Sequence, residues 1–220
     1  MKKRNYILNL FPVLCCLLLV ACSNDDDEQV RYVAKNFQAK GEIKVYTEGG
    51  REIDDETTRN DFLEYFHQIG NGAKPFDDLQ EESFRGMDLM EEEGVITKCA
   101  SVDVIQNEEK NGAEIIRTTV KNEASRFDKM LFDSGVLKYD FYRPEENDKQ
   151  YYHMQYVLHR EKKQIGMSLI SVKLVRWNEQ EQKTEAIVDF AYNELNEEFP
   201  STLGARDTLA VREYKLILSR

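Results

Sequence analysis

The chain has 220 residues, of which 30 are lysine or arginine and 41 are aspartate or glutamate, and its formal net charge at pH 7 is −11. This excess of negative charge excludes nucleic acid as an expected partner, because phosphate backbones bind proteins mainly through clustered cations. The length is sufficient for one globular domain with a single hydrophobic core.

The chain begins like a secretory signal peptide. A short basic patch, Met1–Arg4, precedes an apolar stretch that runs from Tyr6 to Ala21. Its sixteen positions are fewer than the roughly 20 apolar residues that a permanent transmembrane helix needs. The pattern therefore predicts a cleaved signal peptide over residues 1–21.

The residues around the predicted cleavage point carry a second signal. Leu19-Val20-Ala21-Cys22 resembles the lipobox of bacterial lipoproteins. The resemblance implies that the thiol of Cys22 is acylated, that the bond before it is cut, and that the acyl chains anchor the protein in a membrane. The alternative is an ordinary secretory signal that happens to precede a cysteine.

An acidic stretch follows, and residues 22–36 are expected to form a lipidated, solvated linker. The start of this stretch resembles the surface-export signal of lipoproteins from one large group of gut-dwelling Gram-negative bacteria. That resemblance implies a place in the outer membrane, facing the cell exterior, and a lipoprotein that faces the periplasm is the alternative. The residues that carry the resemblance are Ser23, Asn24, Asp25, Asp26 and Asp27.

Residues 37–220 are expected to form a single β-rich domain. Alternating apolar and polar residues predict a strand over 37–47, and aromatic and aliphatic residues at helical spacing predict a helix over 57–70. Residues 72–93 are rich in acids and contain two glycines and a proline. This composition favours an irregular connection with one helical turn.

From Gly94 onward the chain alternates apolar and polar residues in segments separated by turn residues, which is typical of a series of strands. The firmest local prediction is a hairpin, because Gly135 can adopt the positive φ that a compact turn requires. The predicted strands are 95–106, 113–121, 151–160, 164–177, 186–192 and 209–218, together with the hairpin of 127–132 and 136–142.

Eight or nine consecutive antiparallel strands leave two exposed edges unless the sheet closes on itself. One opening strand and a helix before the remaining strands resemble the lipocalin and fatty-acid-binding superfamily, and residues 127–137 are similar to a hairpin of small lipocalin-like lipoproteins. The resemblance implies a mainly β fold, namely an up-and-down barrel with one N-terminal helix and room for a small ligand. An open antiparallel sheet or a β-sandwich is the alternative.

Residues suited to catalysis are scarce. His153 and His159 fall on one face of one strand, roughly 20 Å apart at about 3.3 Å per residue, so they cannot share a metal ion. The sequence contains no phosphate-binding, nucleophile-elbow or zinc motif. Cys99 is the one cysteine beyond Cys22, and it is expected to be buried. We therefore expect no catalytic residue, metal or cofactor, and enzymatic activity has no support.

Aromatic residues in the second half of the chain carry two functional hypotheses. The first is a lipid-anchored binding module for a small apolar or glycan ligand, in which these rings line a pocket or form a platform for sugars. The second is a protein-interaction or structural subunit of the adhesin type, with a filled core and the same rings used for packing. The candidate ligand-binding residues are Tyr139, Phe141, Tyr152, Tyr156, Trp177, Phe190, Tyr192 and Tyr214.

Overall fold

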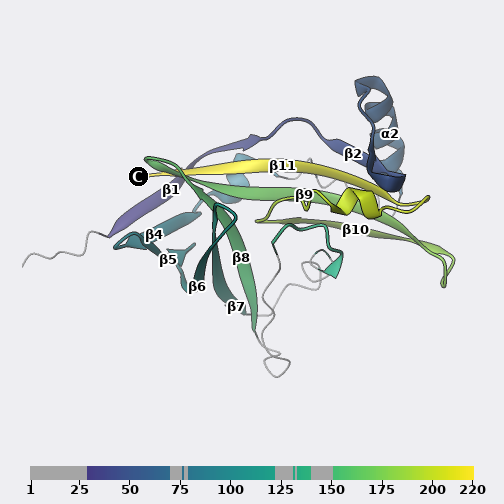
Figure 1. Cartoon of the computed structure of the whole chain (residues 1–220). Helices are drawn as coiled ribbons and strands as arrows, with labels where there is room; N and C mark the ends of the chain where they lie inside the picture. Colours follow the sequence, from purple (N-terminus) through teal and green to yellow (C-terminus); the bar gives the residue numbers. More distant parts are fainter. Residues whose placement is uncertain (1–28, 70–75, 77–78, 122–130, 132, 140–150) are drawn as a thin grey trace, which may run out of the picture.

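The computed structural model describes residues 29–69, 76, 79–121, 131, 133–139 and 151–220 (Figure 1). In the first part of the chain the elements are β1 (Val30–Ala39), β2 (Lys44–Thr47), η1 (Glu48–Gly50), β3 (Arg51–Glu52), α2 (Glu56–Gln68), η2 (Glu81–Phe84), β4 (Asp88–Glu92), β5 (Val95–Cys99), β6 (Val102–Lys110) and β7 (Ala113–Lys121). The second part contributes β8 (Tyr151–Arg160), β9 (Gln164–Asn178), β10 (Lys183–Ala191), η3 (Phe199–Thr202) and β11 (Thr208–Ser219). The three η elements are short 3₁₀ helices.

Eight of the described strands close into a ring through antiparallel pairs. β4 to β9 follow one another in chain order around the ring, β11 pairs with β9, and β1 lies between β11 and β4. The ring therefore closes where the last strand meets the first. The predicted mainly β, antiparallel fold is confirmed, while β10 and the β2–β3 pair extend the sheet beyond the ring.

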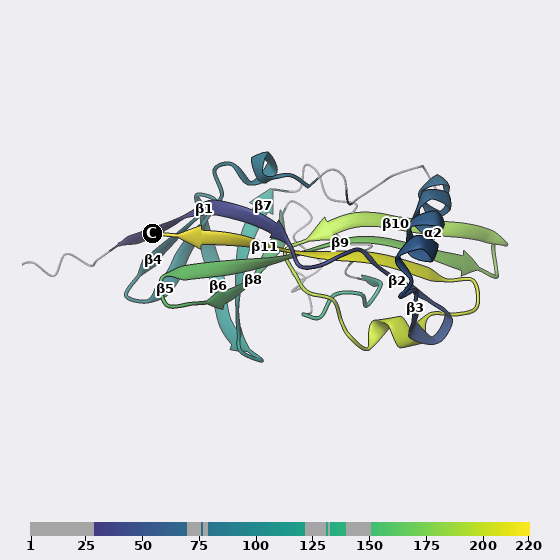
Figure 2. The same ribbon diagram turned by 90° about the horizontal axis from the view of Figure 1, so that it is seen from above.

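β9 and β11 form a long central pair that runs along most of the molecule (Figure 2). Their pairing extends from Gln164 opposite Ser219 to Val175 opposite Thr208. At one end the pair is flanked by β8 and β1 and belongs to the ring, which we call the ring half. At the other end it is flanked by β10 and β2 and carries α2, which we call the helix half. One pair of strands thus contributes to three buried clusters, namely the ring core, the cluster under α2 and a cluster around Phe199.

Side-chain alternation along the central pair separates the cores. Met167 and Leu169 of β9 point into the ring, whereas Val172 and Leu174 point to the opposite face and pack with Phe199. The ring interior is occupied by large apolar side chains. Its buried members are Tyr32, Phe84, Leu89, Ile96, Cys99, Ile116, Tyr156, Leu158, Ile165, Met167, Leu169, Tyr214, Leu216 and Leu218.

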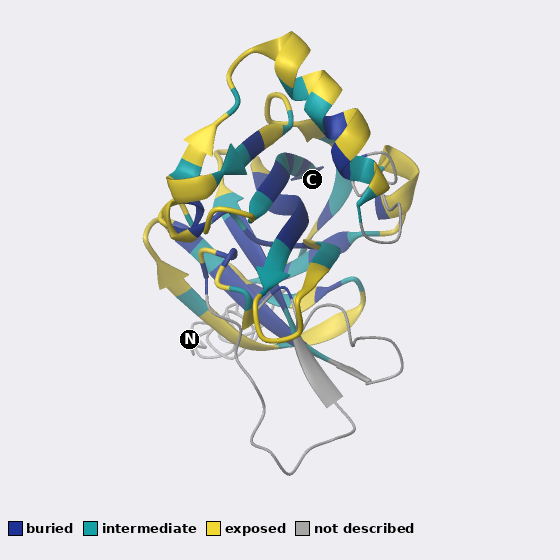
Figure 3. Ribbon diagram, turned by 90° about the vertical axis from the view of Figure 1, so that its right-hand side faces the viewer, coloured by how far each residue is buried: buried dark blue, intermediate teal, exposed yellow. Residues whose placement is uncertain are grey.

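α2 covers the helix half with one apolar face. Its N-terminus is capped by Asp55, whose carboxylate accepts a hydrogen bond of 2.7 Å from the Thr58 amide. Leu63 and Phe66 are buried, and the rest of the helix surface is largely exposed (Figure 3). At the C-terminal end the buried Lys173 donates to the carbonyls of Phe66 and of Ile69, the residue that caps the helix. The predicted helix over 57–70 is thus present with slightly different ends.

The N-terminal part of the fold differs from the expectation. β1 begins at Val30, inside the expected linker 22–36, because Tyr32 is buried in the ring core while the preceding Arg31 is exposed. The predicted strand 37–47 is divided between β1 and β2, which pair with different parts of β11. The expected irregular connection 72–93 contains η2 and also β4, which pairs with β1.

Two later predictions also change. The predicted strand 95–106 is two strands, since Ala100 and Ser101 both adopt positive φ values and turn the chain. The predicted hairpin 127–132/136–142 falls largely outside the described residues. In its described part, Leu131 is helical and Leu137 forms an isolated antiparallel bridge with Leu195 instead of a hairpin pair. These leucines are drawn into the core beneath Phe199.

Candidate ligand-binding cleft

A polar cleft of about 350 Å³ lies beside β2 in the helix half. It is built from segments that are far apart in the sequence, namely β2, η1, the segment before Tyr139, residues 194–197, η3 and β11. The lining residues are Lys44, Tyr46, Gly49, Gly50, Lys138, Glu194, Leu195, Glu197, Pro200, Ser201 and Glu213.

Strand register places the first two lining side chains. Tyr46 lies opposite Leu209 and Lys44 opposite Val211 in the β2–β11 pair. The intervening Val45 is completely buried under α2. Because side chains alternate along a strand, Lys44 and Tyr46 must both point to the opposite face, where the cleft is.

One wall of the cleft depends on a close backbone approach between η1 and η3. The amide of Gly49 donates to the Leu203 carbonyl at 2.9 Å. Gly50 has a φ of +82°, and a Cβ at this position would lie 3.1 Å from the backbone of both Pro200 and Ser201. Glycine is therefore required here for its conformation and for its size.

The carboxylate of Glu194 makes three side-chain contacts at the cleft. Its Oε1 lies 2.6 Å from Nε2 of His159 and accepts a bond of 3.0 Å from the Ser168 hydroxyl. Its Oε2 accepts from the ammonium of Lys138 at 2.8 Å. The hydrogen bond from His159, followed by that from Lys138, lowers the pKa of Glu194 to about 2. This carboxylate is ionised throughout the neutral range.

The tyrosine of the cleft is held in its neutral form. Burial, together with the nearby carboxylates of Glu52, Glu213 and Glu197, raises the pKa of Tyr46 to about 12. Its hydroxyl can therefore donate a hydrogen bond, and its half-buried ring offers an apolar surface. The cleft combines that ring with carboxylates, amines and the Ser201 hydroxyl, a set suited to holding a polar molecule.

The same geometry does not provide a nucleophile. The Ser168 hydroxyl and the His159 imidazole both contact Glu194, so the serine donates to a carboxylate and not to the imidazole, unlike the serine of a catalytic triad. Burial raises the pKa of the Cys99 thiol to about 12, which leaves it unreactive. The described residues contain no group of three or more His, Cys, Asp or Glu side chains placed to hold a metal ion.

The aromatic residues predicted to bind a ligand do not converge on one site. Tyr156 and Tyr214 are buried in the ring core, with Tyr192 packed against it. Tyr139 is buried in a separate small cluster on the outer side of β7 and β8. The ring of Trp177 lies under the guanidinium of Arg206.

Among the remaining candidates, only Phe190 has a described side chain, which is 40% exposed on β10. It contacts the ring of Tyr192 edge to face. Phe141 and the side chain of Tyr152 lie outside the described residues, as do Cys22 and the predicted export signal, residues 23–27. The structure therefore distributes the predicted site over several packing clusters.

Sequence reasoning missed the cleft. Tyr46 lies in a strand whose apolar and polar residues alternate as in any half-buried strand. Glu194 and Lys138 lie in short segments without a recognisable pattern. The one local signal was Gly49-Gly50, which predicts a turn but not a wall built by two 3₁₀ helices. A site assembled from so many segments has no sequence spacing of its own.

Comparison with known protein families, curated proteins and solved structures found no match. Among the described residues, no helix combines the length and the apolar character needed to cross a membrane.

Proposed function

We propose that the protein is a lipoprotein, anchored through Cys22 in the outer membrane and facing the cell exterior, whose domain binds a glycan in the polar cleft. The observation that carries the glycan assignment is the lining of the cleft, where the ring of Tyr46 lies beside carboxylates, amines and a hydroxyl. Sugars present apolar C–H faces that stack on aromatic rings, and hydroxyls that need both donors and acceptors.

The location of the hollows favours a polar ligand over an apolar one. Large buried side chains, among them Met167, Tyr156 and Tyr214, occupy the ring interior. The hollows whose lining residues are all described lie at the surface and are lined by polar as well as apolar groups. A lipidic ligand inside the ring would have to displace well-packed core residues.

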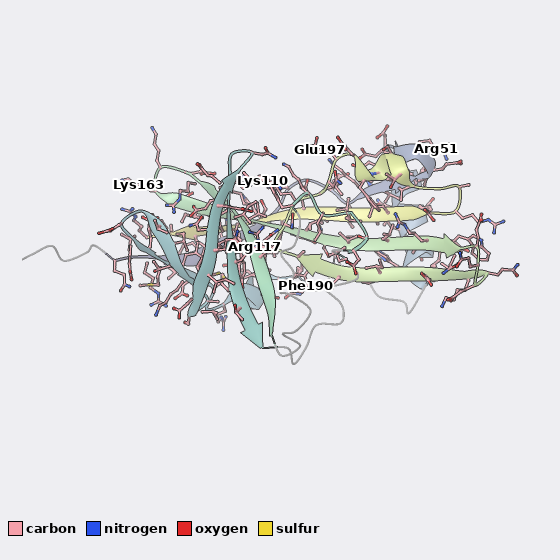
Figure 4. The ribbon with its side chains drawn as sticks, turned by 60° about the horizontal axis from the view of Figure 1, so that its bottom comes forward. Arg51, Lys110, Arg117, Lys163, Phe190 and Glu197 are labelled. Carbon is pink, nitrogen blue, oxygen red and sulfur yellow. The ribbon has the colours of Figure 1, made fainter. Side chains whose placement is uncertain are left out.

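The predicted anchor lies close in sequence to the ring half. Cys22 precedes Val30, the first residue of β1, by eight positions, and a chain of this length spans at most about 28 Å. The anchor would therefore hold the ring half close to the membrane. Figure 4 shows Lys163, in the ring half, near one end of the molecule and Glu197, which lines the cleft, nearer its middle.

A panel of soluble oligosaccharides with neutral, amino and acidic sugars tests the proposal. We expect at least one class to bind, and Tyr46→Ala to weaken that binding about tenfold, the loss expected for one aromatic contact. Tyr65→Ala is the matched control, because Tyr65 is 65% exposed on α2, away from the cleft. Equal losses in the two variants, or no binding by any oligosaccharide, would reject the cleft as a glycan site.

A protein-interaction role is the second candidate function. Exposed β-branched side chains on β5 and β6 favour it, at Val95, Val102 and Ile105. They lie in the ring half, so the two candidate functions use separate surfaces.

A further inference from the structure

Of all neighbouring strands in the ring, β5 and β6 are joined by the fewest residue pairs. Only two residue pairs join these strands, Lys98 with Asp103 and Cys99 with Val102. Beyond these pairs no further residues of the two strands are paired with each other, and the register of β6 is interrupted between Val104 and Gln106 by a bulge at Ile105. Bulges bend a strand away from its neighbour. Residues 95–97 of β5 and residues 104–109 of β6 are therefore unpaired with each other, and we call the interval between them the slot.

The main-chain groups of β6 along this slot can be assigned from its hairpin with β7. Asn111 and Gly112 both have positive φ values, so they form a two-residue turn whose flanking residues are a hydrogen-bonded pair. Hydrogen-bonded pairs alternate along an antiparallel ladder, so Lys110 and Glu108 bond to β7. Asn107 and Glu109 consequently direct their N–H and C=O groups away from β7, into the slot.

The same argument applies to β5. Glu93 and Gly94 form a positive-φ turn between β4 and β5, and Glu92 pairs with Val95 beside it. Val95 therefore bonds to β4, and the next residue, Ile96, turns its N–H and C=O towards the slot. Both margins of the slot present main-chain donors and acceptors, as two neighbours of a missing strand would.

Side chains around the slot are unusually apolar for a surface. Val95 and Ile105 are each 51% exposed and Val102 is 37% exposed, and these are three of the five large hydrophobic residues that are exposed in the described chain. A hollow of about 580 Å³ adjoins the slot. It is lined by Gly94, Val95, Asn107, Glu108, Glu109, Gly112, Glu114 and Arg160.

The charge of the hollow selects the kind of occupant. Three carboxylates line it. Glu114 is paired with Arg160, whose guanidinium also bonds to Glu91 and to the Gly94 carbonyl. Glu108 is paired with Arg117, so among the described residues Glu109 is the carboxylate of this lining without an ion pair. A cationic segment is therefore favoured. The linker of the chain itself, residues 23–28, is acidic and would be repelled.

We propose that the slot between β5 and β6 is a strand-addition site for an extended segment of a partner protein in which apolar residues alternate with basic ones. The segment would satisfy the main-chain groups of Ile96, Asn107 and Glu109. Its apolar side chains would cover Val95 and Ile105, and its basic side chains would approach Glu109. This inference is independent of glycan binding, because no residue of the slot lines the cleft.

The test uses the full chain and a synthetic peptide of about ten residues, the length of a long strand, with valine at alternate positions and lysine or threonine between. We expect saturable binding by fluorescence anisotropy and slower hydrogen exchange at the amides of Ile96, Asn107 and Glu109. Ile105→Lys should weaken binding at least tenfold, while Tyr65→Lys, at another exposed apolar position, should not.

A second peptide, with glutamate in place of lysine, tests the charge argument and should bind at least tenfold more weakly. Circular dichroism establishes that both variants remain folded, as expected for exposed positions. Absence of binding, exchange protection confined to the free edge of β10, or equal affinity of the two variants would each overturn the proposal.

Discussion

The ammonium group of Lys173 closes the C-terminal end of α2, with Nζ 2.8 Å from the carbonyl oxygen of Ile69. It also donates to the Phe66 carbonyl at 3.0 Å. Carbonyls in the last turn of a helix have no partner within the helix, and they carry the negative end of its dipole. A fully buried lysine therefore joins the central strand β9 to the end of the helix.

Lys173→Met should destabilise the domain by about 2 kcal/mol, because buried carbonyls lose their donor while the methionine fills most of the space. The midpoint of urea unfolding measures the change. Lys163→Met, in an exposed turn, is the matched control and should unfold like the parent chain. A Lys173→Met variant as stable as the control would show that the helix end does not depend on this side chain.

We expect protonation of Glu194 to lower the free energy of unfolding of the domain in acid. Its pKa is about 2 in the folded protein and about 4.5 in the unfolded chain, so its contribution is complete above pH 4.5 and disappears as the pH falls towards 2. We expect about 2 kcal/mol, after allowing for partial solvent screening. Urea unfolding at pH 7 and pH 3 measures it. Glu194→Gln should be less stable at pH 7 and should lose less stability between the two pH values than the parent does.

Alanine substitutions at two glycines can distinguish the cost of backbone strain from the cost of a steric clash. Gly41 and Gly50 have similar positive φ values, 85° and 82°, but a Cβ on Gly41 meets nothing within 4 Å, whereas a Cβ on Gly50 meets the backbone of Pro200. Gly41→Ala should cost about 1 kcal/mol, and Gly50→Ala roughly twice that amount. Thermal unfolding compares them. Equal costs would mean that η1 and η3 separate easily, and then the cleft wall is not rigid.

The membrane anchor can be tested in cells. Cys22→Ser should give a folded domain that is released from membranes, because removal of the acyl chains removes most of the membrane affinity. Fractionation with a high-salt wash measures the distribution. If the variant stays in the membrane fraction after the wash, Cys22 is not the anchor.

The export signal has a separate test. Replacing Asp25, Asp26 and Asp27 by alanine should leave lipidation intact but retain the protein on the periplasmic side. Protease added to intact cells should then cleave the parent chain and spare the variant. Equal cleavage of both proteins would reject these acids as the surface address.

Most strands were predictable because their alternation records burial on one face. From Ala113 to Ser219 the predicted strands, hairpin apart, match β7 to β11 within a few residues. The exceptions have local causes. The start of β1 was missed because it follows the acidic run closely and was assigned to the linker, although Arg31 and Lys35 alternate with the inward-facing Tyr32 and Ala34. The turn at Ala100-Ser101 was missed because neither residue is a glycine.

The candidate site was much less predictable than the fold. A ligand site was expected among the aromatic residues of the late strands, but Tyr156 and Tyr214 fill the ring and Tyr139 fills a separate core. Tyr46, by contrast, has carboxylates near it that come from β3, β11 and the segment before η3. Such an arrangement depends on which strands become neighbours, and alternation within a strand carries no information about its partners.

The central pair of β9 and β11 has a consequence for the order of folding. β11 is hydrogen-bonded to β1, β2 and β9, so neither the ring half nor the helix half can be completed before residues 208–219 have been synthesised. The pairing of β1 with β11 joins the first and the last strand of the domain, so it cannot form until almost the whole domain has been synthesised. Until then β1 has only β4 as a paired neighbour, and the ring stays open between β1 and β9.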